Sequence, residues 1–219
     1  GLGKFENLYT RKEKMMSRLL RFSVLFVVTL VAAGCNTMQT TRSDSTIARI
    51  QERGSLILGT SGNMPTMSQA DDQGRVTGFD IDMARLMADG MGVRLETRVM
   101  PFNKLLPALQ AGEVDVVISN MTMNPQRNLN AAFIGPYMTS GKCVITREER
   151  LARALESENL NVPETRLAAL QGSTSAEFLK VLLPDATLTL VEDYDAGVKL
   201  IRDGKVGGIL TDYVITKTN

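Results

Sequence analysis

The fold of this chain is decided by the stretch VDVVISNMTMNPQR, residues 114–127. Its first part, 114–118, is almost wholly apolar, which is typical of a strand covered on both faces of a parallel sheet. Asn124 and Pro125 then predict the start of a helix, with asparagine as N-cap and proline at the first helical position. Polar side chains and the guanidinium of Arg127 therefore follow the carboxyl end of a parallel strand, where ligands bind in open α/β sheets.

An arginine beside a helix N-terminus is well suited to bind a carboxylate. This segment alone leaves a second interpretation open. The helix can be an ordinary capped helix, with the side chain of Arg127 in solvent.

The composition excludes several classes of function. The 219 residues are 43% hydrophobic and 22% charged, an ordinary globular composition with room for one or two domains. Six of the 25 basic and two of the 24 acidic residues lie within 1–34, so the remainder has a net charge of −3 and lacks the basic stripe of a nucleic-acid-binding protein. With no histidine, the chain has no Ser-His-Asp triad, no Cys-His pair and no His-ligated zinc. We expect no metal and no cofactor.

The N-terminal region, 1–34, has the pattern of an upstream extension followed by a lipoprotein signal peptide. Basic residues precede the apolar run 22–33, which is shorter than the ~20 residues needed to cross a bilayer. The small residues that end at Cys35 resemble a bacterial lipobox and predict that Cys35 is lipidated. An ordinary secretory signal with a chance cysteine is the alternative. The polar segment 35–46 then reads as a tether.

The rest of the chain reads as two α/β lobes, 47–140 and 141–219, joined by a crossover near 139–142. In lobe one the β-α-β-α-β order predicts right-handed crossovers and a parallel sheet. Its predicted elements are a strand at 56–58, a helix capped by Asp80, a strand at 93–99, a helix capped by Asn103 and a strand from Val114. Those of lobe two are helices near 148–156, from Thr174 and near 195–202, and strands at 143–146, 167–170, 187–191 and 206–210.

Two local details complete this organisation. Thr174 and Glu177 have the spacing of a capping box, which predicts Thr174 as an N-cap. Cys143 lies in a strand-like run and is expected to be a buried, small apolar residue.

Several motifs together resemble family 3 of the bacterial extracytoplasmic solute-binding proteins, the receptors of ABC importers for polar amino acids. The resemblance covers roughly residues 55–215. The matching motifs are Gly78-Phe79-Asp80-Ile81-Asp82, the helix and turn at 105–115, Met121 to Arg127, Pro136-Tyr137, and Gln171 to Thr174.

The resemblance implies a two-lobed, periplasmic-binding-protein-like type II α/β fold with a ligand cleft between the lobes. Because the chain ends at Asn219, before the family's return crossing, we expect a truncated member with an incomplete second lobe. The implied function is binding of a polar amino acid by hinge closure, without catalysis. The implied partners are the amino acid and the membrane subunits of an ABC importer, and the implied protein is a monomer. It would be exported and anchored to the membrane in the periplasm or at the cell surface.

The resemblance also implies a binding site. Arg127 would hold the α-carboxylate, with help from hydroxyl groups, and Asp212 would hold the α-ammonium. Met64 stands where the family usually has an aromatic wall. Asp80 and Asp82 are expected to be helix caps. The expected ligand-binding residues are Arg127, Asp212, Thr122, Ser119, Asn120, Ser173, Thr174, Phe102 and Met64.

Two other classes of function stay open. Proteins of this fold include dehydratases and binding modules of larger peptidoglycan-acting proteins. An enzyme would need an acid or base in the cleft, and the matching puts only Asp212 there. A sensor domain is a third possibility, but a lipid anchor leaves no transmembrane helix to carry a signal.

Overall fold

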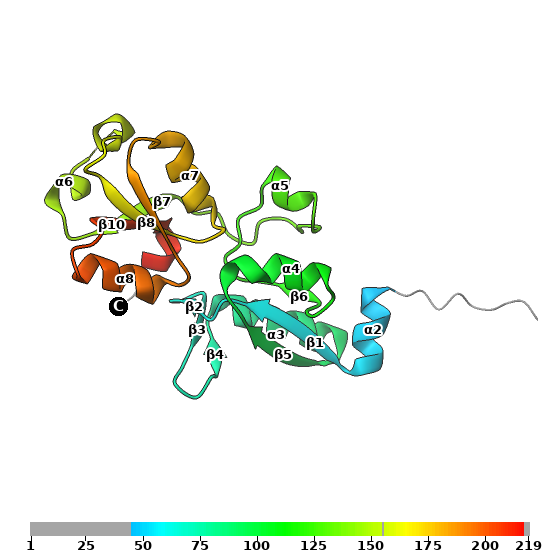
Figure 1. Cartoon of the computed structure of the whole chain (residues 1–219). Coiled ribbons are helices and arrows are strands. Elements are labelled where there is room, and N and C mark those ends of the chain that lie inside the picture. The colour runs from blue at the N-terminus through cyan, green and yellow to red at the C-terminus, as the bar shows by residue number, and fades with distance from the viewer. Residues whose placement is uncertain (1–44, 155, 217–219) are drawn as a thin grey trace, which may run out of the picture. The chain divides into compact units, whose positions relative to one another are not determined.

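The computed structural model describes residues 45–154 and 156–216 (Figure 1). Every helix and strand named below belongs to the compact unit Thr46–Asn219. The predicted signal peptide, residues 35–44 of the predicted tether and Cys35, the predicted site of lipidation, lie outside the described residues, so these assignments stay predictions. Among the described residues, no helix is long and apolar enough to cross a membrane.

The first lobe is built on a parallel sheet of three strands in the order β5-β1-β6, which confirms the predicted parallel arrangement. Its strands are β1 (Ser55–Thr60), β5 (Arg94–Val99) and β6 (Val116–Val117). Strand β6 is shorter than the predicted run. The backbone still follows β1 on either side of it, because the N–H groups of Asp115 and Ile118 donate to carbonyls of β1.

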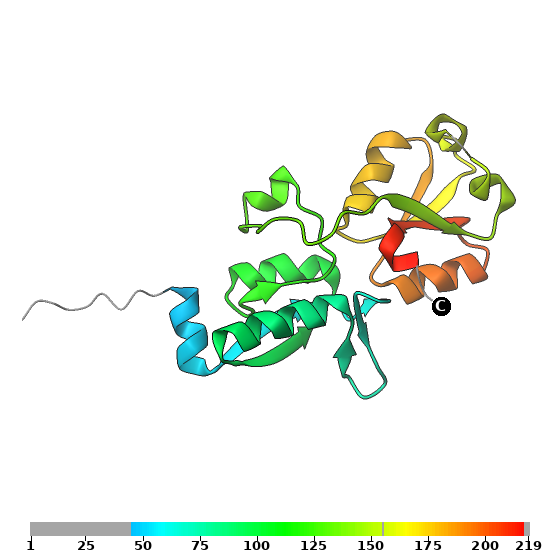
Figure 2. The same ribbon diagram turned by 180° about the vertical axis from the view of Figure 1, so that it is seen from behind.

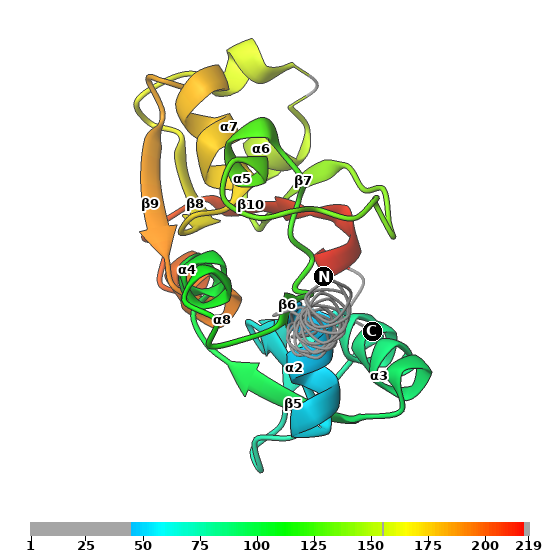
Figure 3. The ribbon, with the colours of Figure 1, turned by 90° about the vertical axis from the view of Figure 1, so that its right-hand side faces the viewer.

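The central strand β1 is buried on both faces by helices, as its apolar sequence predicts. Its residues alternate. Leu56 and Leu58 pack with residues of α3 (Phe79–Met91), whereas Ile57 packs with Ala108 of α4 (Leu105–Gln110). The two helices therefore cover opposite faces of the sheet, as Figure 3 shows. The short helix α2 (Thr46–Arg53) buries Ile50 against the same face as α3.

Helix α3 does not begin as predicted. Its N-cap is Gly78, with φ 129°, and Asp80 does not cap the helix. The N–H groups of Phe79 and Asp80 donate instead to the carbonyls of Thr66 and Met67. A Cβ on Gly78 would collide with the carbonyl of Met67. The close approach of two backbones therefore sets the helix start, and the capping rule applied to Asp80 was wrong.

The carbonyls that accept these N–H groups lie in a turn of a small antiparallel sheet, between its first two strands. Its strands are β2 (Asn63–Met64), β3 (Ser68–Ala70) and β4 (Val76–Thr77), in the order β2-β3-β4. Met64 and Met67 are almost completely buried there. Both methionines belong to the largest apolar cluster among the described residues.

The two remaining helix starts of lobe one differ in outcome. Helix α5 (Pro125–Asn128) begins as predicted, because the side chain of Asn124 accepts the N–H of Arg127 at 2.8 Å. Asn103 does not cap α4. It lies inside the short 3-10 helix η1 (Phe102–Lys104), and Lys104 occupies the N-cap position.

The second lobe has a four-stranded sheet in the order β7-β10-β8-β9 (Figure 2). Strands β8, β9 and β10 are parallel, whereas β7 runs antiparallel to β10. The strands are β7 (Lys142–Thr146), β8 (Arg166–Leu170), β9 (Thr187–Val191) and β10 (Gly208–Asp212). The helices are α6 (Glu149–Ala152), η2 (Ser157–Leu160), α7 (Thr174–Leu182), α8 (Tyr194–Arg202) and η3 (Tyr213–Thr216).

Three local predictions for this lobe differ from the structure. The N-cap of α7 is Ser173, whose side chain accepts the N–H of Ala176 at 3.2 Å, so Thr174 is not the cap. The hydroxyl of Thr174 is therefore available for other contacts. Cys143 is only partly buried in β7, although burial still raises the pKa of its thiol. The helix predicted near 148–156 is reduced to the single turn of α6.

One apolar cluster runs through both lobes. Phe102 and Leu105 of lobe one belong to the same cluster of buried side chains as Leu170, Tyr194 and Ile209 of lobe two. Met64 and Met67 of the small sheet are also part of this cluster. Burial of apolar surface therefore stabilises the contact between the lobes as well as each lobe's interior.

The start of α3 can be tested by substitution. Gly78→Ala should lower the free energy of unfolding by about 1–3 kcal/mol or more, because the φ angle is unfavourable for alanine and the methyl group meets a carbonyl. Gly90→Ala is the matched control in the same helix, where no atom lies near the new methyl group. It should gain roughly 0.5–1 kcal/mol. The measurement is urea denaturation, and equal midpoints for the two variants would contradict this account.

Candidate functional site

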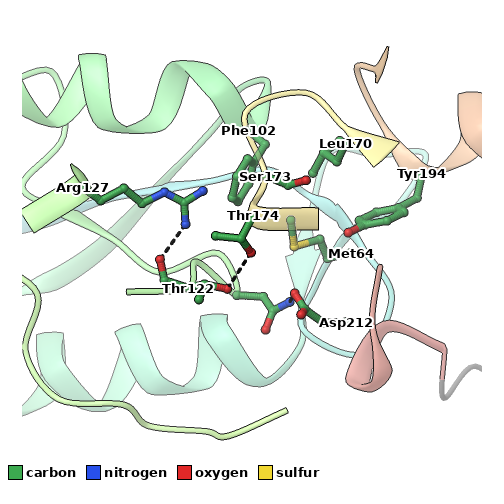
Figure 4. Close-up of a pocket in the computed structure, with 10 residues that line it drawn as sticks. Met64, Phe102, Thr122, Arg127, Leu170, Ser173, Thr174, Tyr194 and Asp212 are labelled. Atoms are coloured by element: carbon green, nitrogen blue, oxygen red, sulfur yellow. Dashed lines mark hydrogen bonds between the residues drawn. The ribbon is translucent and has the colours of Figure 1, made fainter. Parts of the chain in front are cut away.

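A small pocket is lined by residues of both lobes (Figure 4). Its cavity of about 10 Å³ has room for about one water molecule. The 10 lining residues come from loops and element ends of both lobes: Met64, Phe102, Asn120, Thr122, Arg127, Leu170, Ser173, Thr174, Tyr194 and Asp212.

The structure brings together all the predicted pocket residues except Ser119. That residue is fully buried, and its hydroxyl donates to Ser61 Oγ at 3.1 Å and accepts the N–H of Ser61 at 3.0 Å. Ser119 therefore ties the end of β6 to the end of β1, and it is not among the lining residues. Sequence reasoning missed Leu170 and Tyr194. Leu170 is the last residue of the parallel strand β8, and Tyr194 follows the parallel strand β9. Their positions at the carboxyl ends of parallel strands were the sequence signal that could have identified them.

Arg127 is the most enclosed charged side chain of the pocket, with only 8% of its surface exposed. Its guanidinium donates to the carbonyl of Thr122 at 2.6 Å and to that of Gly172 at 2.8 Å. It also lies 5.6 Å from the ring centroid of Phe102, in cation–π contact. The bond to Gly172 crosses from lobe one to lobe two.

Burial lowers the pKa of Arg127, and the nearby negative charges of Glu177 and Asp212 oppose that shift. Within residues 45–154 and 156–216, no carboxylate lies in ion-pair contact with this guanidinium. A buried cation whose partners are neutral carbonyls is one that a bound carboxylate would stabilise.

Asp212, the last residue of β10, has a partner on each carboxylate oxygen. Lys142 Nζ donates to Oδ1 at 2.7 Å, and the side-chain amide of Asn120 donates to Oδ2 at 3.2 Å. The ammonium of Lys142 also donates to Thr174 Oγ1 at 3.0 Å. Thr174 in turn donates to Thr122 Oγ1 at 3.3 Å. Figure 4 shows Thr174, Thr122 and Asp212 close together in the pocket.

These polar contacts link the lobes directly. Asn120 and Thr122 of lobe one bond to Asp212 and Thr174 of lobe two, and Arg127 bonds across the same boundary. The side chains fill most of the space between them. A ligand larger than water therefore requires the lobes or these side chains to move apart.

Asp80, predicted as a helix cap, has a different role next to the pocket. It is fully buried and accepts the hydroxyl of Tyr137 at 2.8 Å and the N–H of Asn120 at 2.9 Å. Burial raises the pKa of Asp80 to about 6, although both hydrogen bonds favour its charged form. Burial also raises the pKa of Tyr137. Asn120 has φ 46°, so the bond from its N–H to Asp80 holds it in a left-handed conformation.

Tyr194 closes one wall of the pocket and is almost fully buried. Its hydroxyl oxygen accepts the hydroxyl of Thr211 at 2.9 Å. Burial raises the pKa of Tyr194 to about 12. The side chain therefore presents a neutral aromatic wall with its polar end already bonded.

The chemistry available in the pocket is that of binding a small polar solute. It offers one guanidinium, one carboxylate, four hydroxyl-bearing side chains and apolar walls. In the part of the chain that the structure describes, no cluster of acidic, cysteine or histidine side chains could hold a metal ion. A pocket that is lined from two α/β lobes defines a two-lobed solute-binding fold.

The comparisons with known proteins agree with this class. The model of the bacterial extracellular solute-binding proteins, family 3, matches residues 56–216, and the chain belongs to this family. Among solved structures, it resembles the ancestral amino acid-binding protein AncCDT-1, described as a precursor of cyclohexadienyl dehydratase. The TM-score is 0.74 at 33% identity, covering 78% of this chain and 75% of that one. The two-lobed α/β prediction is thereby confirmed.

Two curated relatives show the range of the family. Cyclohexadienyl dehydratase of Pseudomonas aeruginosa is 28% identical over 171 residues, which cover 78% of this chain and 64% of that protein. The glutamine-binding protein of Geobacillus stearothermophilus is 26% identical over 183 residues, covering 82% and 69%. The chain thus spans less than two thirds of the length of the first relative.

The buried carboxyl group of Asp80 predicts a pH dependence of stability. Its pKa in the folded protein, about 6, lies above the ordinary value of 3.8. The folded protein therefore favours the protonated form of this carboxyl group. The stability that this preference contributes is fully present below pH 3.8 and is lost as the pH rises through about 6. Relative to wild type, Asp80→Asn should gain stability as the pH rises from about 4 to about 7, on the order of 1–3 kcal/mol.

The measurement is the urea midpoint of both proteins across that pH range. Asp82→Asn is the matched control for loss of a carboxylate, because Asp82 is exposed in the same helical turn. A difference between Asp80→Asn and wild type that does not change with pH would contradict the assignment.

Proposed function

We propose that this protein is the lipid-anchored substrate-binding component of an ABC importer, and that it binds a polar amino acid in the pocket between its lobes. Family membership supports the general class, since the family consists of extracellular solute-binding proteins. The relatives include a glutamine-binding protein. The ligand, the anchor and the importer are the proposed parts.

The observation that carries the proposal is the buried guanidinium of Arg127. Its hydrogen-bond acceptors are two carbonyl oxygens, one in each lobe. Burying a charge is costly unless an opposite charge compensates it. The α-carboxylate of an amino acid would supply that charge, and the planar guanidinium suits a carboxylate.

The other pocket residues have roles that fit the same ligand. Asp212 would bind the α-ammonium, because a carboxylate suits a compact, strongly hydrated cation. Asn120, Thr122, Ser173 and Thr174 would donate or accept hydrogen bonds at the backbone of the ligand. The apolar walls are Met64 and Phe102, together with Leu170 and Tyr194.

Binding would be coupled to closure of the lobes. The contacts of Arg127 with Gly172, and of Asn120 with Asp212, join the two lobes in the closed arrangement. A ligand that touches both lobes only when they are closed shifts the population toward that state. An importer could then distinguish the loaded receptor from the empty one by its shape.

Export and anchoring complete the proposal. The segment 1–34 would direct export and Cys35 would carry the lipid. Residues 35–46 would be the tether, and 47–140 and 141–219 the two lobes. The protein would act as a monomer in the periplasm or at the cell surface.

A dehydratase-like enzyme is the second candidate, and one observation favours it. Cyclohexadienyl dehydratase of Pseudomonas aeruginosa is among the relatives of this chain. Such an activity needs a proton donor or acceptor in the pocket. Asp212 is the one carboxylate among the lining residues, and Lys142 and Asn120 already bond to it.

The carboxylate assignment predicts a loss of affinity. Arg127→Met should weaken binding of an amino acid by ~2–5 kcal/mol, at least about thirtyfold at 1.4 kcal/mol per decade. The loss follows because the variant keeps the aliphatic bulk and removes the charge. Arg98→Met, an exposed arginine of lobe one, is the matched control. The measurement is calorimetric titration of the full chain in detergent with the standard L-amino acids.

Two outcomes would redirect the assignment. Equal affinities of wild type and Arg127→Met would remove the carboxylate role. Turnover of a bound solute that disappears in Asp212→Asn would favour the enzyme over the receptor.

The anchor is tested separately. When the protein is expressed in a bacterium supplied with labelled fatty acid, wild type should carry the label and Cys35→Ala should not, because Cys35 follows an apolar run and small residues. Cys143→Ala is the matched control, since Cys143 lies within strand β7. Equal labelling of wild type and Cys35→Ala would exclude the lipid anchor.

A further inference from the structure

Lys142 is a charged residue at the pocket that sequence reasoning did not assign to the site. It is the first residue of β7, and it lies opposite Asp212 in the antiparallel register of β7 and β10. The register brings the two side chains together across the strands. Lys142 Nζ lies 2.7 Å from Asp212 Oδ1, with 23% and 16% of the two side chains exposed.

This ion pair occupies the position where the ligand's ammonium would bind. In the proposed function, Asp212 is the partner of the α-ammonium. The protein's own Lys142 already supplies an ammonium group to that carboxylate. The same ammonium group makes a second hydrogen bond, to Thr174 Oγ1 at 3.0 Å. The other carboxylate oxygen accepts the amide of Asn120 at 3.2 Å.

We propose that Lys142 is a specificity-determining residue that competes with the α-ammonium of an amino acid for Asp212. This inference rests on the proposed function of the pocket. An amino acid must displace Lys142 from Asp212 or share the carboxylate with it, and the two ammonium groups repel each other. An α-keto acid can bind without displacing Lys142 from Asp212. Its carboxylate can bind Arg127, and its carbonyl oxygen can accept a hydrogen bond from Lys142.

The charges around the pocket support this competition. Arg127 and Lys142 are two cations, and Asp212 is the one anion among the lining residues. An amino acid brings one charge of each sign, whereas a keto acid of the same skeleton brings a single negative charge. With Lys142 in place, the pocket therefore favours the keto acid more than a pocket with Arg127 and Asp212 alone would.

A purely structural role for Lys142 makes a different prediction. A cross-strand ion pair in partial contact with water contributes about 0.2–1 kcal/mol to stability. Its loss would lower the stability of lobe two and weaken every ligand alike. The competition instead changes the ratio of two affinities, which a uniform loss leaves constant.

The experiment measures that ratio in the full chain in detergent. Wild type and Lys142→Met are titrated calorimetrically with the standard L-amino acids and their α-keto acids, such as L-glutamate and α-ketoglutarate. Lys142→Met should raise the affinity for the amino acid relative to its keto acid about tenfold, or ~1.4 kcal/mol. Lys199→Met is the matched control, because it removes an ion pair with Asp203 on the exposed side of α8.

A second variant keeps the test decisive if Lys142→Met does not fold. Asp212→Asn removes the ammonium site and frees Lys142, so the same ratio should fall, with weaker binding of the amino acid and stronger binding of the keto acid. A ratio within about twofold of wild type in whichever of these two variants folds overturns the competition.

The results also separate this proposal from the function on which it rests. If Arg127→Met weakens amino acid binding but the ratio is unchanged in Lys142→Met, the receptor assignment stands and the role of Lys142 is wrong. If neither wild type nor Lys142→Met binds any amino acid or keto acid of the panel, both proposals are overturned.

Discussion

The pocket depends on one buried carboxyl group, that of Asp80. It accepts the backbone N–H of Asn120 from the end of β6 and the hydroxyl of Tyr137 from the segment that leads to the second lobe. Three separate parts of the chain therefore meet at one side chain. Because Asn120 is held with φ 46°, its side-chain amide reaches Asp212 of the other lobe. The position of a lining residue is thus set by a residue that does not itself line the pocket.

This arrangement places several charges in a small, partly dry volume, where each needs its partners. Arg127 has carbonyl acceptors and a ring beneath it, Asp212 has Lys142 and an amide, and Asp80 has two donors. Removing one partner leaves the other group desolvated and unpaired, which is costly in a medium of low dielectric constant. The network is therefore sensitive to any solute that adds or removes a charge, and sensitivity of this kind is what a binding site requires.

The sequence predicted those features of the fold that depend on local pattern. The cap at Asn124 and the parallel β-α-β order of lobe one follow from residues close together in the chain, and the structure confirms them. The predictions for Asp80 and Thr174 failed for different reasons. Helix α3 begins at Gly78, where the backbone of another segment approaches, whereas at α7 the adjacent hydroxyl residue Ser173 is the cap.

Two errors of sequence reasoning at the site, at Ser119 and at Lys142, depend on contacts between distant segments. Ser119 carries a polar side chain at a strand end, as a ligand-binding residue would, but the neighbouring Ser61 takes its hydroxyl. Lys142 reaches Asp212 only because β7 runs antiparallel to β10, a pairing between segments 70 residues apart. The sequence shows a lysine and an aspartate at these two positions, but no local pattern predicts the register that pairs them.

The same pair of residues bears on whether this fold acts here as a receptor or an enzyme. A general acid must carry a proton that it can donate, and a general base must have a lone pair free for the substrate. Both oxygens of Asp212 already accept hydrogen bonds, one from an ammonium and one from an amide. Such a carboxylate is organised to hold a cation in place. As long as Lys142 or a ligand's ammonium occupies it, the pocket binds and orients a solute, and catalysis would first require that cation to leave.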